Sequence, residues 1–128
     1  MSYYSQVAIM CDKPTYGKFI KIIKEYKMNR PTRILHYDDE VFMVFWESIQ
    51  WFPKQRTVMK KLIETMEDTS NEDLSWTMIR IGENTTDIEL KTCNSDFSID
   101  TRRKTMLPVN MTDIDYDEEL GTDCAYNR

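Results

Sequence analysis

His36 is the only histidine in the chain, and it stands just before two carboxylates, Asp38 and Asp39. A histidine that is oriented by a carboxylate can act as a general base and can activate a serine or cysteine nucleophile. The same spacing is also typical of a strand residue beside an acidic hairpin turn. No GxSxG, HExxH or glycine-rich phosphate-binding motif accompanies it, in a chain with three glycines. We therefore expect no catalytic residue, and an enzyme centred on His36 is the least favoured hypothesis.

Cysteine is the other residue type that could bind a metal, and the chain holds three: Cys11, Cys93 and Cys124. They are widely spaced and form no CxxC pair, so neither a disulfide framework nor a redox motif is indicated. A zinc site would need more cysteine or histidine ligands than the sequence offers. The acidic run 38–40 lacks the ligand spacing of a calcium-binding loop. We expect no metal site and no cofactor.

Basic residues are concentrated between Lys13 and Arg33, where seven lysines and arginines stand against one glutamate. Lys18, Lys21 and Lys24 fall on the polar side of an expected helix, where they could contact phosphates. A small RNA- or nucleotide-binding domain that uses this helix and the sheet face is therefore the alternative function. The net charge of −5 argues against it, as does the lack of the aromatic, basic and glycine-rich motif of RNA-recognition sheets.

The segment from Lys104 onward is the acidic pole of the chain, with six acidic residues and two basic ones. It is either a flexible, solubilising terminus or a segment that docks on a basic surface through its apolar residues. That surface belongs to a partner protein or to the basic helix of the same molecule, because carboxylates, like phosphates, offer acceptor oxygens to Arg and Lys. The residues that we expect to contact a partner here are Asp113, Asp115, Tyr116, Asp117, Glu118 and Glu119.

The stretch Val41–Phe52 is rich in aromatic residues and includes two of the three tryptophans. Both faces of Val41–Glu47 are apolar, which predicts a central strand that is covered on both sides. Because helices would cover only one side, the other side needs a lid, either a late hairpin of the same chain or a second copy in a homodimer. Trp51 and Phe52 fall in the bend after this strand, and we expect them to contact a partner.

Alternating and helical patterns of apolar residues give the element order β-α-β-β-α-β-β-β. The expected helices begin after Asp12, as an N-cap, and at Pro53, in a position that suits proline. The expected strands are Tyr4–Cys11, Thr32–Tyr37, Val41–Glu47, Leu74–Ile81, Asp87–Cys93 and Phe97–Arg103. This order predicts one α+β domain over residues 1–108: a ferredoxin-like β-α-β-β-α-β plan with an added β-hairpin, in which two helices cover one face of a mainly antiparallel sheet. Residues 109–128 are expected to form an acidic, flexible C-terminal tail.

The length of 128 residues suits one domain. No apolar run is long enough to span a membrane, and the first residues lack the basic and apolar regions of a signal peptide. Together with the unpaired cysteines, these features favour a cytoplasmic protein without a membrane partner.

Three short segments resemble a family of small uncharacterised phage and prophage proteins. The first is 2–5 (SYYS), similar to G-Y-Y-S in the family. The second is 47–52 (ESIQWF), similar to a segment that ends in I-K-W-Y. The third is 79–84 (IRIGEN) with 87–89 (DIE), similar to I-R-I-G-E-D followed by D-I-E.

The chain departs from this family at Ser2 and Asn84, where glycine and aspartate are usual, and its tail from Lys104 has no counterpart. The resemblance implies a phage-encoded protein of the host cytosol, of the size common among inhibitors of host factors. It implies no catalytic residue.

Within the third segment we expect Gly82 in the turn between the fourth and fifth strands, with Arg80 and Glu83 paired across it. Our leading hypothesis is a non-catalytic, phage-type binding module. It would inhibit or modulate a host protein through the aromatic and acidic residues named above.

Overall fold

The computed structural model describes residues 3–25, 30–50, 58–68, 73–84, 86–94, 111–115 and 119, without the side chain of Met59. Within these residues the helices are α1 (Lys13–Glu25) and α2 (Val58–Glu67). The strands are β1 (Tyr4–Asp12), β2 (Arg33–Tyr37), β3 (Val41–Gln50), β4 (Trp76–Gly82), β5 (Ile88–Cys93) and β6 (Thr112–Asp113). The predicted strand 97–103 lies outside the described residues.

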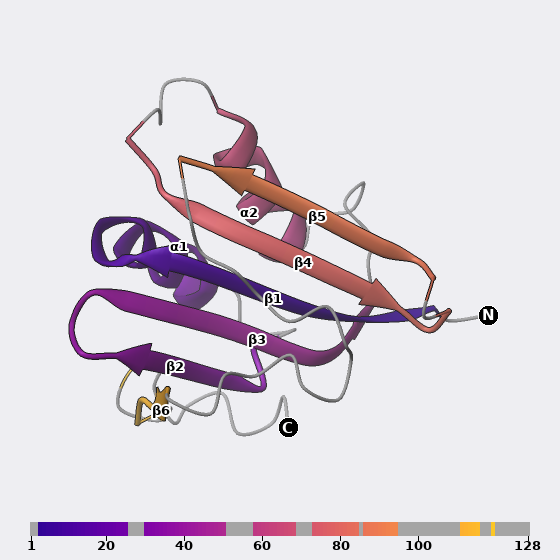
Figure 1. Cartoon of the computed structure of the whole chain (residues 1–128), viewed down its shortest axis with the longest axis horizontal. Helices are drawn as coiled ribbons and strands as arrows, with labels where there is room; N and C mark the ends of the chain where they lie inside the picture. Colours follow the sequence, from indigo (N-terminus) through magenta and orange to yellow (C-terminus); the bar gives the residue numbers. More distant parts are fainter. Residues whose placement is uncertain are drawn as a thin grey trace.

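The strands form one sheet in the order β5-β4-β1-β3-β2-β6, and all neighbours are antiparallel (Figure 1). β1 therefore lies between β3 and β4, and its pairing with β3 is irregular only between Ser5 and Val7. The α+β class, with one antiparallel sheet and two helices in a single domain, agrees with the prediction. The strand order differs from the predicted plan, because β5 and β6 extend the sheet at its two edges.

α1 begins where the sequence predicts, after Asp12. The carboxylate of Asp12 accepts a hydrogen bond from the backbone N of Thr15 at 3.0 Å, which satisfies a free donor of the first turn. The buried apolar residues of the helix are Tyr16, Phe19, Ile20 and Ile23. Burial of this stripe against the sheet stabilises a helix of a length that would be marginal in isolation.

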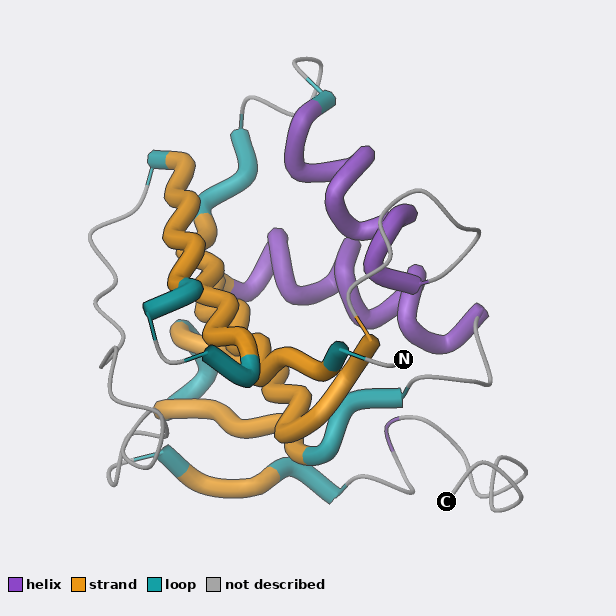
Figure 2. The backbone as a smooth tube through the Cα atoms, turned by 90° about the vertical axis from the view of Figure 1, so that its right-hand side faces the viewer, coloured by secondary structure: helices purple, strands orange, loops and turns teal. Residues whose placement is uncertain are grey.

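Both helices lie on one face of the sheet, so that the molecule has two layers (Figures 1 and 2). Alternate residues of the central strands point into the helix layer, and Val44 and Trp46 of β3 join α1 and α2 in the main core. Trp46 is only 1 % exposed. Aromatic residues of this size contribute a large share of the hydrophobic stabilisation of a small domain.

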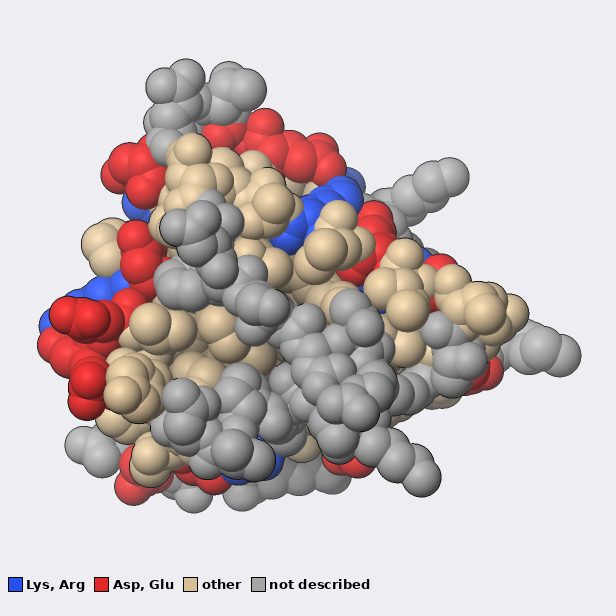
Figure 3. Space-filling model, viewed as in Figure 1, with Lys and Arg blue, Asp and Glu red and all other residues tan. Residues whose placement is uncertain are grey.

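The opposite face of the sheet is apolar as well. Its buried side chains are Ala8, Met10, Leu35, Met43, Phe45, Ile79 and Ile81, none more than 6 % exposed in a single copy of the chain. Met111, just before β6, packs against them. Figure 3 views the molecule from this side and shows the described charged residues mostly around the rim. One copy of the chain therefore buries this face without a second copy as its lid.

Part of the predicted acidic tail belongs to the sheet, because Thr112 and Asp113 form β6 beside β2. The backbone N of Ile114 donates to the carbonyl oxygen of Ile34 at 2.8 Å. The side chain of Ile114 packs against the main core. The sheet thus continues past residue 108, where the sequence predicts the domain to end.

Candidate functional site

The residues predicted to contact a partner fall into two groups. Trp51, Phe52, Tyr116, Asp117 and Glu118 lie outside the described residues, so their role stays a prediction. Asp113, Asp115 and Glu119 are described, and they lie on the side of the molecule formed by β2 and the start of α1.

Asp113 binds Arg33 of β2 through two parallel hydrogen bonds. Nε of Arg33 donates to Oδ1 of Asp113 at 2.8 Å, and Nη2 donates to Oδ2 at 2.7 Å. This hydrogen bonding is the main reason why the pKa of Asp113 lies below its ordinary value. The side chains of Arg33 and Asp113 remain 40 % and 56 % exposed. At that exposure the pair arranges the edge of the sheet more than it stabilises the fold.

Glu119 lies close to Tyr16 of α1. Burial raises the pKa of the Tyr16 hydroxyl, and the nearby carboxylate of Glu119 raises it further. The hydroxyl has no hydrogen-bond partner within the described part of the chain, so we attribute the effect of Glu119 mainly to its charge. The backbone N of Glu119 donates to the carbonyl oxygen of Asp115 at 3.0 Å, which places these two residues in one turn. The acidic segment therefore contacts its own molecule through Asp113, and Glu119 lies near Tyr16.

Lys18, Lys21 and Lys24, on which the nucleic-acid alternative depends, are exposed on α1. Nζ of Lys18 lies 3.9 Å from Oδ1 of Asp73. The sheet face that an RNA-recognition fold would offer to bases contains buried Phe45, 4 % exposed, which leaves its ring no surface for stacking. Exposed lysines alone would give sequence-independent phosphate contacts, and no other feature of the described residues favours this alternative.

His36 has its ring between a turn and an aromatic side chain. Its Nδ1 donates to the backbone carbonyl oxygen of Asp38 at 2.5 Å, and the ring stacks on Phe42 with 6.3 Å between the centroids. The carboxylate of Asp39 instead accepts a hydrogen bond from Nζ of Lys13 at 2.6 Å. Among the described contacts, neither carboxylate binds the imidazole, so the arrangement of a catalytic His–Asp pair is not formed.

Cys11 is buried in β1, and burial raises the pKa of its thiol, which makes it a poor nucleophile. Over the described ranges, no group of His, Cys, Asp or Glu side chains could hold a metal ion. Neither of the two described helices is long and apolar enough to cross a membrane.

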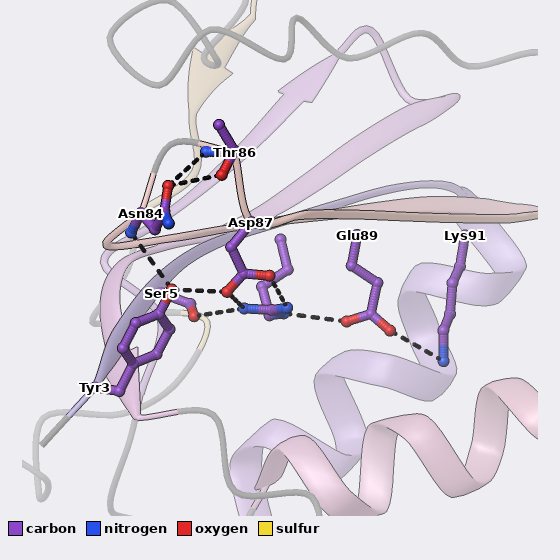
Figure 4. A network of polar contacts seen from close by, with 8 residues as sticks. Tyr3, Ser5, Asn84, Thr86, Asp87, Glu89 and Lys91 are labelled. Carbon is purple, nitrogen blue, oxygen red and sulfur yellow. Dashed lines mark hydrogen bonds and ion pairs between the residues drawn. The ribbon is translucent and has the colours of Figure 1, made fainter.

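A cluster of polar side chains lies at the end of the sheet where β1 begins and β4 ends (Figure 4). At its centre is Arg80, whose side chain is 12 % exposed. Its Nη1 and Nη2 donate to the two carboxylate oxygens of Asp87 at 3.1 and 2.9 Å. Nε donates to Glu89 of β5, and Nη1 also donates to Oγ of Ser5, both at 3.1 Å. We call Tyr3, Ser5, Arg80, Asp87 and Glu89 the Arg80 network.

Tyr3 connects the residues before β1 to this network. Its hydroxyl donates to Oδ2 of Asp87 at 2.7 Å and accepts from the backbone N of Asn84 at 3.4 Å. The backbone N of Tyr4 donates to Oε1 of Glu83 at 3.0 Å. The side chains of Tyr3 and Tyr4 are each 39 % exposed. The side chain of Tyr3 and the backbone of Tyr4 are thus held by hydrogen bonds, and both rings still face solvent.

Gly82 is the last residue of β4, and its lack of a side chain makes room for the network. A Cβ at this position would collide with the Tyr3 hydroxyl and the Asp87 carboxylate. Gly82 is thus the last strand residue before the turn, one position from its predicted place, and its backbone N donates to the carbonyl oxygen of Asp87. The ion pairs of Arg80 are with Asp87 and Glu89 and not with the predicted Glu83. Arg80 points toward β5 across the strand pair, whereas Glu83 lies beyond the end of β4 and binds the backbone of Tyr4.

Hydrogen bonds within the Arg80 network favour the charged forms of Arg80 and Asp87. Hydrogen bonds from Arg80 and from Tyr3 keep the pKa of Asp87 below its ordinary value. Burial lowers the pKa of Arg80, but its hydrogen bonds to Asp87 and Glu89 outweigh burial and raise it. A general acid or base needs a pKa near the working pH. The arrangement is therefore suited to fixing side chains for binding, and not to proton transfer.

The Arg80 network joins residues of the first and third of the three segments singled out in the sequence. Tyr3 and Ser5 belong to the first segment, and the charged residues of the network belong to the third. The second segment lies alongside, since Ser5 pairs with Ile49 of β3 on one side and with Gly82 of β4 on the other. Local periodicity cannot reveal this site, because Tyr3 and Asp87 are 84 residues apart in the chain. The order of the three segments is the only sequence signal for it.

The chain matches no protein-family model, no curated protein and no solved structure. Its function must therefore be argued from its own residues. The features of the structure that suggest a function are two exposed tyrosines, the Arg80 network and the edges of the sheet.

Proposed function

We propose that the chain is a non-catalytic binding module that contacts a partner protein with the end of the sheet where Tyr3 and Tyr4 lie. The observation that carries this proposal is the fixation of Tyr3 by Asp87, which Arg80 holds in turn. Tyrosine is enriched at protein interfaces because it offers a large ring and loses little conformational entropy on binding. A tyrosine that is already fixed in the free protein loses less still, which favours affinity.

The scaffold of this module is proposed to follow the ferredoxin-like plan. In support, its four inner strands have the order β4-β1-β3-β2, with α1 after β1 and α2 after β3. β5 and β6 are then additions at the two edges. A site on the ends of such strands is held more precisely than a site on a long loop.

The chemistry of the partner follows from the groups around the tyrosines. Glu83 accepts from the backbone of Tyr4, and the one cation Arg80 is shared by two carboxylates, Asp87 and Glu89. Negative charge therefore exceeds positive charge among these four side chains. A complementary surface would offer apolar contact and Lys or Arg side chains. The resemblance to phage proteins favours a cytoplasmic host protein as this partner, which the module would inhibit or modulate.

The residues that the sequence predicts to contact a partner support this proposal to different degrees. Asp113 already has Arg33 as a partner, and both Asp113 and Asp115 are exposed. Trp51 and Phe52 follow Gln50 in the sequence, and Gln50 pairs with Tyr4. Trp51 and Phe52 themselves lie outside the described residues, so their contribution stays a prediction.

Alanine at Tyr4 tests the proposal, with alanine at Tyr37 as the matched control. Both side chains are exposed, at 39 % and 49 %, and they lie at opposite ends of the sheet. The immobilised chain is incubated with a bacterial lysate, and captured proteins are quantified by mass spectrometry. We expect a protein that the native chain and Tyr37→Ala capture equally and that Tyr4→Ala loses, with about 2 kcal/mol of weaker binding once that protein is purified.

Circular dichroism of the two variants checks that both have folded. If Tyr4→Ala captures the same proteins in the same amounts as the native chain and the control, the proposed surface is wrong.

A further inference from the structure

β5 is the last strand at one edge of the sheet among the described residues. It pairs with β4 on one side, and no strand among the described residues pairs with its other side. Ile88 and Leu90 of this strand are 44 % and 60 % exposed. An apolar, unpaired edge is a template for another strand, and most proteins avoid leaving one in solvent.

The backbone groups of β5 alternate between its two sides. The hydrogen bond from the backbone N of Gly82 to the carbonyl oxygen of Asp87, at 2.9 Å, fixes this alternation. In an antiparallel ladder every second residue is bonded to the same neighbour, so Glu89 and Lys91 direct their N–H and C=O groups to β4. Leu90, between them, directs its N–H and C=O groups to the open side. The edge thus offers backbone donors and acceptors beside an exposed leucine.

We propose that two copies of the chain pair antiparallel through β5, with Leu90 opposite Leu90 of the second copy. In this register Glu89 lies opposite Lys91 of the second copy, and Lys91 lies opposite its Glu89. Opposite charges on facing residues stabilise a strand pair. Ile88 lies opposite Thr92, on the same face as the two leucines. The strand is therefore complementary to itself in the backbone groups of Leu90, in charge and in apolar side chains, whereas the N–H of Ile88 already donates to Thr86.

Charge also favours this register over the two registers that are shifted by two residues. A shift by two residues in one direction places Glu89 opposite Glu89, and a shift in the other direction places Lys91 opposite Lys91. Like charges in these positions destabilise the pair. Within one chain, Nζ of Lys91 lies 3.7 Å from Glu89 and 3.7 Å from Glu67, and the side chains of Lys91 and Glu89 keep exposures of 38 % and 33 %. Both can therefore take part in pairs with a second copy.

The dimer joins two six-stranded sheets into one continuous sheet and removes the open edge from both. It is independent of the binding function proposed above. Because the paired strands run in opposite directions, the tyrosines of the two copies would lie at opposite ends of the strand pair.

Crosslinking tests the register. Facing residues of a hydrogen-bonded antiparallel pair have Cα atoms about 5.5 Å apart, which suits a disulfide. Leu90→Cys, in a chain with Cys93→Ser and Cys124→Ser, should give a reducible dimer in a glutathione redox buffer. Thr92→Cys is the matched control, because its two copies would be about 14 Å apart and out of reach. No crosslink at Leu90→Cys, or an equal one at Thr92→Cys, overturns the register.

Sedimentation velocity over a concentration series tests the association itself. Leu90→Pro removes only a backbone N–H on the open side, and Leu90→Lys places two lysines opposite each other. We expect the native chain to change from monomer to dimer mass with rising concentration, as should the control Tyr37→Lys. Both Leu90 variants should stay monomeric with an unchanged circular dichroism spectrum. A native chain that stays monomeric throughout, or a dimer that survives Leu90→Lys, overturns the proposal.

Discussion

Arg33 and Arg80 have similar partners on opposite sides of the sheet, yet they differ in burial. Each guanidinium binds both oxygens of an aspartate, Asp113 for Arg33 and Asp87 for Arg80. The side chain of Arg33 is 40 % exposed, and that of Arg80 is 12 % exposed. Partial removal of water strengthens a charge pair and raises the cost of leaving one member alone. The comparison indicates that the Arg80 pair stabilises the fold, whereas the Arg33 pair mainly places β6.

The two edges of the sheet also differ in how far they are covered by the rest of the chain. β2 is covered by β6, a strand of only two residues, which is followed by Ile114 in the main core. β5 is longer and has no such cover among the described residues. A short strand can thus close an edge when an apolar residue next to it is buried.

Replacing Arg80 with leucine should have the largest effect. It leaves the carboxylate of Asp87 without its cation and leaves Glu89 with Lys91 alone, so we expect the free energy of unfolding to fall by about 2 kcal/mol. Urea unfolding followed by circular dichroism at neutral pH measures this change. Arg33→Leu is the matched control, with an expected loss of about 0.5 kcal/mol. Equal losses in the two variants would mean that burial does not explain the difference between the arginines.

Replacing Ile114 with alanine should have the next largest effect. The side chain is partly buried against the main core, so its truncation should lower the free energy of unfolding by about 1 kcal/mol. The same urea experiment measures it, with Ile88→Ala on the open edge as the control. If Ile114→Ala and Ile88→Ala lower the free energy of unfolding equally, the closed edge does not depend on the burial of Ile114 next to β6.

Acid should weaken the Arg33–Asp113 pair. The pKa of Asp113 in the folded protein lies below its ordinary value of 3.8. Its contribution to stability is therefore present above that value and is lost as the pH falls through the folded pKa. The difference in free energy of unfolding between the native chain and Asp113→Asn should be largest near neutral pH and should shrink on acidification. A difference that is constant with pH would show that the charge of Asp113 is not its source.

Replacing Leu90 with lysine should have the smallest effect on the single chain. The side chain is 60 % exposed, so the free energy of unfolding should change by no more than about 0.5 kcal/mol, measured where the native chain is monomeric. If Leu90→Lys lowers the free energy of unfolding as much as Ile114→Ala does, the two edges do not differ in burial.

Periodicity was sufficient to predict the elements whose apolar residues face the core. Tyr16, Phe19 and Ile23 mark α1 by their helical spacing, and the two apolar faces of β3 predict its central place. The pattern could not predict β6, because Thr112 and Asp113 have no alternation of their own. They form a strand only because β2 offers an edge and Arg33 offers a partner.

The Arg80 network was missed for a related reason. The sequence places Arg80 close to Glu83, and a pair between them is the simplest local expectation. The actual partners depend on which strand lies next to β4 and on where Tyr3 lies, both of which are set by the whole sheet. The role of Gly82 likewise becomes visible only when the Tyr3 hydroxyl occupies the space of its missing side chain.

The central position of β1 has a consequence for the kinetics of folding. β1 pairs with residues 41–50 on one side and with residues 76–82 on the other. Both pairings close long loops, so chain entropy must be lost before the strands stabilise each other. Helices such as α1 can form within microseconds, but they remain marginal until the sheet covers them. The slow step of folding should therefore be the insertion of β1 between β3 and β4.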